Sequence, residues 1–261
     1  MIAPEISVII PAYNEAGVIR QTVQAVAQEF QAHGMTCEIL VVDDGSTDQT
    51  VECVRTLNLT WPLLRLLTTA HRGKGAAVKH GMLAAQGRYR VFLDADHSTH
   101  IREFWPCLPW LRDGYEVVIG SRKMSGATIQ IRQPLVRELM GKVFTRLTNL
   151  ILGIQVTDIT CGFKCFHAEA ARHLFGQQHI DGWGFDAELL FLAHWFGYRV
   201  KELPVIWQDD ASTKVRLLRD AWGSFMEFLR IRIAAWQGRY HRQVFTSARY
   251  EDAHAVTGAR S

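Results

Sequence analysis

Cysteines and long hydrophobic runs are both scarce in this sequence, and each shortage argues against a class of protein. Five cysteines among 261 residues show no paired spacing typical of a disulfide framework or a zinc site, so we expect reduced thiols in a cytoplasmic protein. No window approaches the roughly 20 apolar residues that a membrane-spanning helix needs, and the N-terminus lacks the basic and apolar segments of a signal peptide. We therefore expect a protein that is soluble or lies on one face of a membrane.

A large excess of charge of one sign is also missing. The formal net charge is +3, which is too weak to indicate a nucleic-acid partner, and we expect none. The apolar content is ordinary and the charges are mixed, as in globular chains. The length fits one large α/β domain, or one domain with an appendage.

Apolar runs typical of strands alternate with helical patterns through the first half of the chain. We predict strands at 5–13, 37–46, 63–69, 89–96 and 115–122. Apolar residues recur at helical spacing at 17–30, from about 49, and at 73–87, where Gly87 closes the last helix. This alternation predicts right-handed βαβ units and an α/β fold with a mostly parallel sheet flanked by helices.

Polar residues follow each of the five predicted strands. They are Tyr13 to Glu15, Asp43 with Asp44, His71 to Lys74, Asp94 with Asp96, and Ser121 with Arg122. In open parallel sheets the ligand crevice lies beyond the carboxyl ends of the strands. The sequence therefore predicts a binding site at this edge of the sheet.

The Asp94-Ala95-Asp96 motif is the strongest candidate for a metal site. Residues i and i+2 of a strand point the same way, so two carboxylates at a strand end can share one hard cation. Mg²⁺ and Mn²⁺ are typically held by one or two carboxylates, with substrate phosphates completing the shell. The alternative is an exposed acidic turn, which the position after a buried strand disfavours.

Two further motifs point to a nucleotide. Asp43 and Asp44 precede a helix cap, yet a cap needs only one such residue, so a carboxylate here can accept from a nucleobase or a ribose. The glycine-rich segment 71–75 opens a helix, where backbone N–H groups favour anions, although a solvated basic loop is the alternative. The fingerprints of P-loop ATPases and of nicotinamide dehydrogenases are both absent.

The second half of the chain contains two long helical patterns. The first, at 133–154, carries Arg137 and Arg146 among its polar positions. The second, at 214–237, has an apolar face flanked by basic residues, which either packs on its own domain or suits an anionic membrane surface. That face comprises Val215, Leu218, Trp222, Phe225, Met226, Leu229, Ile233 and Trp236.

The order of these motifs resembles a known family. "VIIPAYNEAGVI", "VVDDGSTDQT", "GKGAAVKHGM", "FLDADHST" and "IGSR" resemble the N-terminal half of family 2 glycosyltransferases, which have the GT-A fold. "TDITCGFKCF", "GWGFDAELLFLA", "ELPVIWQDDASTKV" and "RDAWGSFMEFLRIR" resemble the dolichyl-phosphate glucosyltransferase branch, related to dolichyl-phosphate mannose synthases. We expect a GT-A domain at 1–211, an amphipathic, membrane-associated helix at 212–240 and a flexible tail at 241–261.

The resemblance implies a metal-dependent, inverting transfer of a hexose from a nucleotide sugar to a polyprenyl or dolichyl phosphate. UDP-glucose is the implied donor, and the implied place is the cytoplasmic face of a membrane. A family 2 transferase that uses GDP-mannose, or a sugar or protein acceptor, stays open. A non-catalytic nucleotide-binding module and a homo-oligomer stay open as well.

The resemblance also implies roles for individual residues. Residues for the nucleotide sugar are Pro11, Tyr13, Glu15, Val42, Asp44, Lys74, Asp94, Ala95, Asp96, Arg122 and Lys214. Asp94, Asp96 and Ser98 are implied ligands of Mg²⁺ or Mn²⁺, although relatives often have Gln in place of Ser98. Arg137 and Arg146 are candidates for the lipid phosphate, and Asp158, Asp186 and Arg122 for the reacting centre.

The segment "GWGFD" departs from the family pattern. It stands where relatives often show an Arg-Trp-Ala-Phe-Asp pattern, so an arginine is missing. Trp183 and Phe185 are still expected to shape the pocket. Either Asp158 or Asp186 would orient the sugar, or act as a base if the acceptor is a hydroxyl group.

Overall fold

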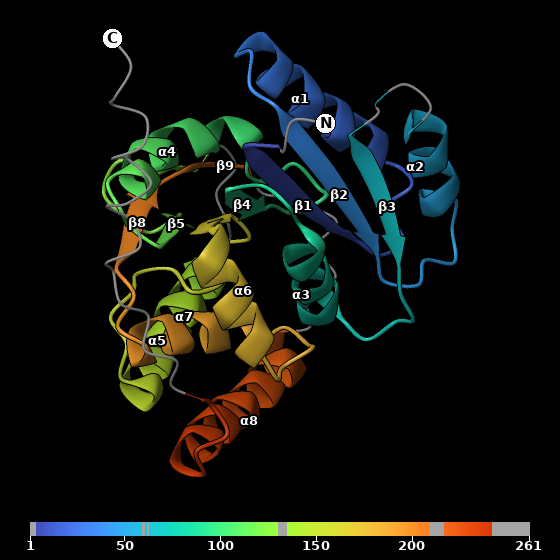
Figure 1. Ribbon diagram of the computed structural model, residues 1–261. Coiled ribbons are helices and arrows are strands. Elements are labelled where there is room, and N and C mark those ends of the chain that lie inside the picture. Colours follow the sequence, from blue (N-terminus) through green and yellow to red (C-terminus); the bar gives the residue numbers. More distant parts are fainter. Residues whose placement is uncertain (1–3, 59–60, 62, 130–134, 209–216, 242–261) are drawn as a thin grey trace, which may run out of the picture.

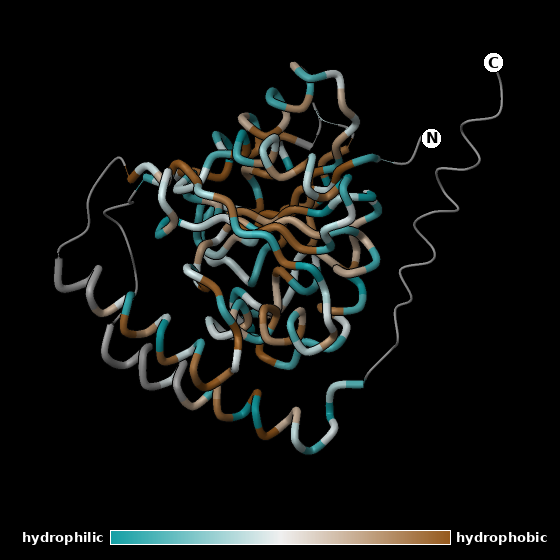
Figure 2. Tube along the Cα trace, turned by 90° about the vertical axis from the view of Figure 1, so that its left-hand side faces the viewer, coloured by the Kyte–Doolittle hydropathy of each residue, from teal (hydrophilic) through white to brown (hydrophobic). Residues whose placement is uncertain are grey.

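A seven-stranded sheet with helices on both faces forms the centre of the molecule (Figure 1). Its strands are ordered β3-β2-β1-β4-β7-β5-β8. A computed structural model describes residues 4–58, 61, 63–129, 135–208 and 217–241. Hydrophobic residues concentrate in the strands at the centre (Figure 2).

The first half of the chain forms the predicted βαβ units. Strands β1 (Ile6–Ala12), β2 (Cys37–Asp43), β3 (Leu64–Thr68) and β4 (Tyr89–Phe92) are mutually parallel. Helices α1 (Ile19–Ala32), α2 (Thr50–Asn58) and α3 (Lys74–Ala84) connect them. Every residue of β1 is buried, as expected for a central strand covered on both faces.

Alternate residues of β1 enter two separate cores. Val8 and Ile10 belong to the core that includes residues of α1 and α2. Ile9 belongs to the core on the other face, which includes residues of α3. This period of two is what a strand buried on both faces requires.

Several predicted boundaries were wrong, and strand β2 ends at Asp43 and not at residue 46. Helix α3 ends at Ala84 and not at Gly87. The chain leaves the helix there because the N–H groups of Gln86 and Gly87 donate to the Glu38 carboxylate. Strand β4 ends at Phe92 and not at Asp96.

The sheet contains an antiparallel strand that the sequence did not predict. Strand β7 (Lys164–His167) lies between β4 and β5 (Val117–Ser121) and is antiparallel to both. Strand β8 (Val200–Pro204) pairs with β5 in parallel. Strand β7 has only four residues and begins with a lysine, so it lacks the apolar run that identifies the other buried strands.

Short elements and helices complete the second half. A 3₁₀ turn (Ile101–Glu103) leads into α4 (Phe104–Arg112), and β6 (Thr128–Ile129) pairs with β9 (Ile206–Trp207). The remaining helices are α5 (Leu135–Leu152), α6 (Ala168–Gln177), α7 (Phe185–Trp195) and α8 (Leu217–Trp236). Helix α8 packs against α5 and α7 at one end of the molecule (Figure 1).

The side of α8 that packs is not the apolar face expected from the sequence. Phe228 and Ile231 are buried. Met226, Leu229, Ile233 and Trp236 are exposed by 40%, 37%, 51% and 88%. The other members of the expected face lie at positions whose side chains the structure does not describe. Periodicity identifies an apolar face without specifying what covers it.

Candidate active site

Asp94, directly after β4, forms an ion pair with Lys74 at the first position of α3. Burial alone would lower the pKa of Lys74, but Asp94, Asp186 and Asp96 together raise it. The Lys74 ammonium also lies 5.4 Å from the centre of the Trp183 ring. Three segments that are distant in sequence therefore meet at the predicted edge of the sheet.

The carboxylate of Asp94 lies directly against the backbone of Gly162. A Cβ atom at Gly162 would collide with this carboxylate. Gly162 does not have a positive φ, so close approach, and not backbone conformation, requires glycine here. Gly162 was not among the predicted site residues, because only the folded chain brings it to Asp94.

Asp96 closes the turn after β4. Its Oδ1 accepts a hydrogen bond from the Ser98 N–H at 2.9 Å, and His97 between them has a φ of 60°. The Ala95 carbonyl accepts from the Thr22 hydroxyl at 2.6 Å. These contacts hold the turn that carries both acids.

The acids of this turn suit a hard divalent cation. Within the described residues, no three His, Cys, Asp or Glu side chains converge as metal ligands. Two carboxylates nevertheless fit Mg²⁺ or Mn²⁺, which usually take further oxygens from substrate phosphates and water. The Lys74 ammonium at Asp94 demonstrates that positive charge is accommodated there.

Asp44 accepts hydrogen bonds from the loop that opens α3. Its oxygens accept from the N–H groups of Arg72 and Gly73 at 2.9 and 2.8 Å, and the His71 Nδ1 lies 2.8 Å from Oδ2. The His71 ring stacks on Tyr13 with centroids 4.2 Å apart. In this structure an internal carboxylate, and not a phosphate, is the anion at these N–H groups.

The other residues predicted for the nucleoside lie nearby but differ in access. Tyr13 is 39% exposed. Val42 is fully buried among the residues packed under α3, so its side chain is not available to a ligand. Pro11 is buried within β1, and the Glu15 N–H donates to the Thr50 hydroxyl at 2.8 Å.

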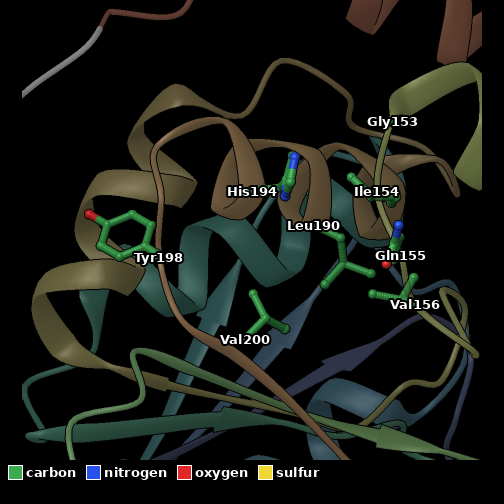
Figure 3. A pocket seen from close by; sticks show the side chains of 8 residues that line it. All are labelled: Gly153, Ile154, Gln155, Val156, Leu190, His194, Tyr198 and Val200. Carbon is green, nitrogen blue, oxygen red and sulfur yellow. The ribbon is translucent and has the colours of Figure 1, made fainter.

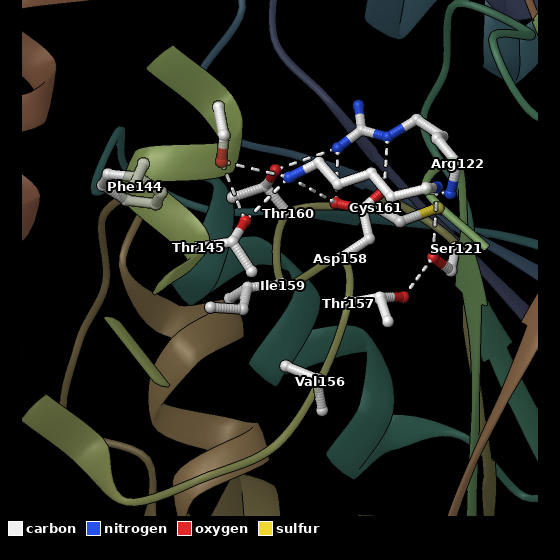
Figure 4. A network of polar contacts seen from close by, with 12 residues as sticks. Ser121, Arg122, Phe144, Thr145, Val156, Thr157, Asp158, Ile159, Thr160 and Cys161 are labelled. Atoms are coloured by element: carbon white, nitrogen blue, oxygen red, sulfur yellow. Dashed lines mark hydrogen bonds and ion pairs between the residues drawn. The ribbon is translucent and has the colours of Figure 1, made fainter. Parts of the chain in front are cut away.

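Asp158 and Arg122 form a tightly bonded ion pair beyond β5 (Figure 4). The guanidinium donates to the two carboxylate oxygens at 2.7 and 2.8 Å, and the Arg122 N–H donates at 3.0 Å. Burial alone would raise the pKa of Asp158, but Arg122 and Lys123 bring it below its ordinary value. The lowered pKa favours the ionised form of Asp158 at neutral pH and makes it a weaker base than an ordinary aspartate.

Lys123 extends this network toward α5. Its ammonium donates to the Thr145 hydroxyl at 2.7 Å and to the Gly141 carbonyl at 3.2 Å. It also lies 3.9 Å from Asp158 Oδ1. Lys123 was not among the predicted site residues, although it follows Arg122 directly.

Asp186, at the start of α7, pairs with the buried Lys164 of β7. The ammonium lies 2.5 Å from Asp186 Oδ1 and also donates to the carbonyls of Ile159 and Cys161. Burial raises the pKa of Asp186, and Lys164 and Lys74 oppose that rise only in part. Lys164 was missed because a lysine inside a short strand gives no signal in the sequence.

Among the remaining predicted basic residues, the structure describes only the side chain of Arg146. Arg146 is exposed on α5. Arg137 belongs to α5, but its side chain is outside the described part of the structure, as is the whole of Lys214.

A separate cavity of about 310 Å³ lies beside α7 (Figure 3). Residues of α7 and of the segment 153–156 contribute to it. Its lining is Gly153, Ile154, Gln155, Val156, Leu190, His194, Tyr198 and Val200. None of the predicted site residues lines this cavity.

The fold is thus a mostly parallel α/β sheet with acidic residues beyond the carboxyl ends of its strands, where open sheets of this kind bind their ligands. The family model described as "Glycosyl transferase family 2" matches residues 7–175. The chain therefore belongs to glycosyl transferase family 2.

Several curated relatives are similar over most of this chain. Dolichyl-phosphate beta-glucosyltransferase ALG5C of Trichomonas vaginalis is 35% identical over 80% of this chain and 65% of its own length. Dolichyl-phosphate beta-glucosyltransferase of Saccharomyces cerevisiae is 31% identical over 90% and 76%. Glycosyltransferase AglD of Haloferax volcanii is 33% identical over 87% of this chain, which spans only 36% of that protein.

Solved structures of glucosyl-3-phosphoglycerate synthase from Mycobacterium tuberculosis have the same fold. The complex with Mn²⁺, UDP-glucose and phosphoglyceric acid has a TM-score of 0.65 and 20% identity, covering 87% of this chain and 79% of that chain. The complex with Mg²⁺ and UDP has a TM-score of 0.64 and 20% identity, covering 92% and 80%. At this level of identity, the likeness shows that the chain shares the fold of those structures.

Proposed function

We propose that this protein transfers glucose from UDP-glucose to a polyprenyl phosphate of the dolichyl type, with inversion at the anomeric carbon. Membership of family 2 and the names of the curated relatives support this reaction. The observation that carries the proposal is the meeting of Asp94, Asp96 and Lys74 at the carboxyl edge of the sheet.

The donor's diphosphate would lie beside these three residues. Asp94 and Asp96 would hold a divalent cation, which when bound supplies positive charge for the leaving diphosphate. Ser98 is a third candidate ligand through its hydroxyl group. Lys74 would exchange its partner from Asp94 to a donor phosphate, because an ammonium pairs with either anion.

The acceptor needs positioning more than deprotonation. A phosphomonoester has a second pKa of about 6, so it is largely ionised at pH 7. One of its oxygens would form the new bond to the anomeric carbon, while the bond to UDP breaks and leaves its electron pair on the diphosphate. Arg122 and Lys214 are our candidates for contacts with the donor's phosphates, and Arg137 and Arg146 for the lipid phosphate.

Asp186 is a better candidate than Asp158 for contact with the sugar. Both oxygens of Asp158 already accept from Arg122, so we assign Asp158 to holding the arginine. Asp186 lies close enough to Lys74 and Asp94 for their charges to affect its pKa. It would orient a sugar hydroxyl group at the site.

The outer faces of α5 and α8 support a location on the cytoplasmic face of a membrane. Leu150 on α5 is 80% exposed and Trp236 on α8 is 88% exposed. Arg146, Arg230 and Arg232 are exposed on the same two helices, and basic residues near an apolar face favour anionic lipid headgroups. No helix in the described part of the chain is long and apolar enough to span a bilayer.

A transfer assay with matched donors and acceptors tests the proposal. UDP-glucose and GDP-mannose would each be offered with polyprenyl phosphate in vesicles, with 3-phosphoglycerate, and with a peptide. We expect radiolabelled glucose in the lipid fraction only, and only with Mg²⁺ or Mn²⁺ present. Transfer to a soluble acceptor alone would contradict the lipid acceptor, and nucleotide binding without transfer would indicate a non-catalytic module.

A further inference from the structure

Glu227 of α8 extends its carboxylate to the turn that precedes α7. This carboxylate lies directly beside Gly184, which is the N-cap residue of α7. Burial raises the pKa of Glu227, while the Gly184 N–H and Arg230 oppose that rise. A negative charge at this position also suits the positive end of the α7 dipole.

Two glycines of the turn lie directly against Glu227. A Cβ atom at Gly184 would collide with the Glu227 carboxylate, and one at Gly182 would lie 3.2 Å from Oε1. Gly184 has a φ of −76° and a ψ of −2°, and Gly182 does not have a positive φ. Any residue can adopt the backbone of Gly184, so the space taken by Glu227 accounts for glycine there, and at Gly182 it leaves little room for a side chain.

The residues that this turn carries belong to the candidate active site. Trp183, between the two glycines, is the ring that lies over the Lys74 ammonium. Asp186 follows Gly184 by two positions and pairs with Lys164. A change in the path of residues 182–186 would therefore move two groups at the site together.

A second carboxylate fixes the other end of the same loop. Glu188 of α7 accepts from the N–H groups of His179 and Ile180 at 2.9 and 2.8 Å. It also accepts from the hydroxyl of Tyr240, beyond α8, at 2.8 Å. Glu188 of α7 thus holds one end of the loop, and Glu227 of α8 lies at the other end.

We propose that Glu227 is a positioning residue, which couples the placement of α8 to the geometry of Trp183 and Asp186. Contact of α8 with a lipid surface would then favour the arrangement of the turn that reacts. The Asp94 and Asp96 side of the site would be unaffected, because among the described residues Glu227 forms no hydrogen bond or ion pair with Asp94, Asp96 or Lys74. The part of this inference that concerns glucose transfer rests on the proposed function.

The test compares Glu227→Ala with Glu227→Gln, which keeps an oxygen acceptor for the Gly184 N–H. Misplaced catalytic groups can cost about a hundredfold in rate, so we expect Glu227→Ala to lower kcat with vesicle-bound acceptor by roughly tenfold to a hundredfold. The KM for UDP-glucose should change less than about twofold, since Asp94 and Asp96, which would bind the donor's diphosphate, keep their positions. Glu227→Gln should retain most of the activity, and the exposed control Glu52→Ala should retain all of it.

A double-mutant cycle separates positioning from a general loss of stability. Gly184→Ala should impair transfer in the native background by displacing the Glu227 carboxylate. In the Glu227→Ala background it should add little further loss, because the obstacle is gone. Gly223→Ala on α8, where an added Cβ meets nothing within 4 Å, is the matched glycine control.

Amide hydrogen exchange tests the same inference without any substrate. Exchange across residues 178–190 should be faster in Glu227→Ala than in the native protein and unchanged in Glu227→Gln. Native exchange together with native kcat in Glu227→Ala would overturn the inference, as would additive effects in the cycle. If native protein transfers no glucose but the exchange result holds, the proposed function fails and the positioning role of Glu227 stands.

Discussion

The Asp158–Arg122 pair and the Asp94–Lys74 pair both lie at the carboxyl edge of the sheet, but their carboxylates are held differently. Asp158 is fully buried, and Arg122 donates three hydrogen bonds to it. Asp94 has a side-chain exposure of 27% and a single lysine as its ion-pair partner. Arg122 and Asp158 hold each other in a fixed geometry. Lys74, in contrast, is a point charge beside the partly exposed carboxylate of Asp94.

This difference indicates that the two ion pairs have different roles in the reaction. A bidentate arginine holds a carboxylate in one orientation, which suits a part of the site that does not change during the reaction. A lysine is a compact charge on a flexible stem, and it can exchange one anion for another. The Asp94–Lys74 pair is therefore the part of the site that we expect to rearrange when a donor and a metal ion bind.

The largest effect is expected from removing a carboxylate of the Asp94 and Asp96 turn. Asp96→Ala should lower metal-dependent glucose transfer by about a thousandfold, because a metal ion contributes several kcal/mol to transition-state stabilisation. The protein should remain folded, with unchanged circular dichroism. Asp113→Ala, at an exposed position after α4, is the control, and native turnover in Asp96→Ala would remove the metal role from Asp96.

The next prediction compares how much each of the two ion pairs contributes to the free energy of unfolding. Asp158→Asn should lower the free energy of unfolding by about 3 kcal/mol, because it leaves a largely buried arginine without its counter-ion. Asp94→Asn should cost less than about 1 kcal/mol, because the Asp94 carboxylate is partly exposed and the Lys74 ammonium keeps Asp96 and Asp186 as neighbouring negative charges. Denaturant titrations measure both values. Equal losses would mean that the two pairs do not differ as described.

A smaller effect is expected at Gly162, where space and not charge is changed. Gly162→Ala should displace the Asp94 carboxylate and lower the transfer rate by roughly tenfold, as for a modest misplacement of a catalytic group. Gly176→Ala is the matched control, because an added Cβ there meets nothing within 4 Å. If steady-state kinetics give both variants the same rate, Asp94 does not need its present position.

The smallest expected effect concerns pH and the two buried carboxyls. The pKa of Asp158 is lowered in the folded state. Its contribution to the free energy of unfolding is therefore present at pH values above the pKa of the unfolded state, and it is lost as pH falls through the pKa of the folded state. The pKa of Asp186 is raised, so its contribution has the opposite sign and is lost as pH rises above the ordinary value of 3.8. Denaturation at several pH values should show opposite changes of slope in Asp158→Asn and Asp186→Asn, and changes of the same sign would contradict the assignment.

The first half of the fold was predictable because each strand is a buried apolar run that ends in polar residues. Strand β7 was not, since four residues beginning with Lys164 resemble a loop in the sequence. The pairing of Asp158 with Arg122 joins residues 36 positions apart, which no local pattern reveals. The helical period of 214–237 predicted α8, but it did not reveal that Ile233 and Trp236 lie on the outside.

The central claim is that Asp94 and Asp96 bind the donor's diphosphate through a divalent cation. Calorimetric titration of UDP into the native protein and the Asp94→Asn and Asp96→Asn variants, with and without Mn²⁺, tests it most directly. We predict that Mn²⁺ tightens UDP binding at least about tenfold in the native protein, or about 1.4 kcal/mol, and has no such effect in either variant. Equal tightening by Mn²⁺ in all three proteins would contradict the claim.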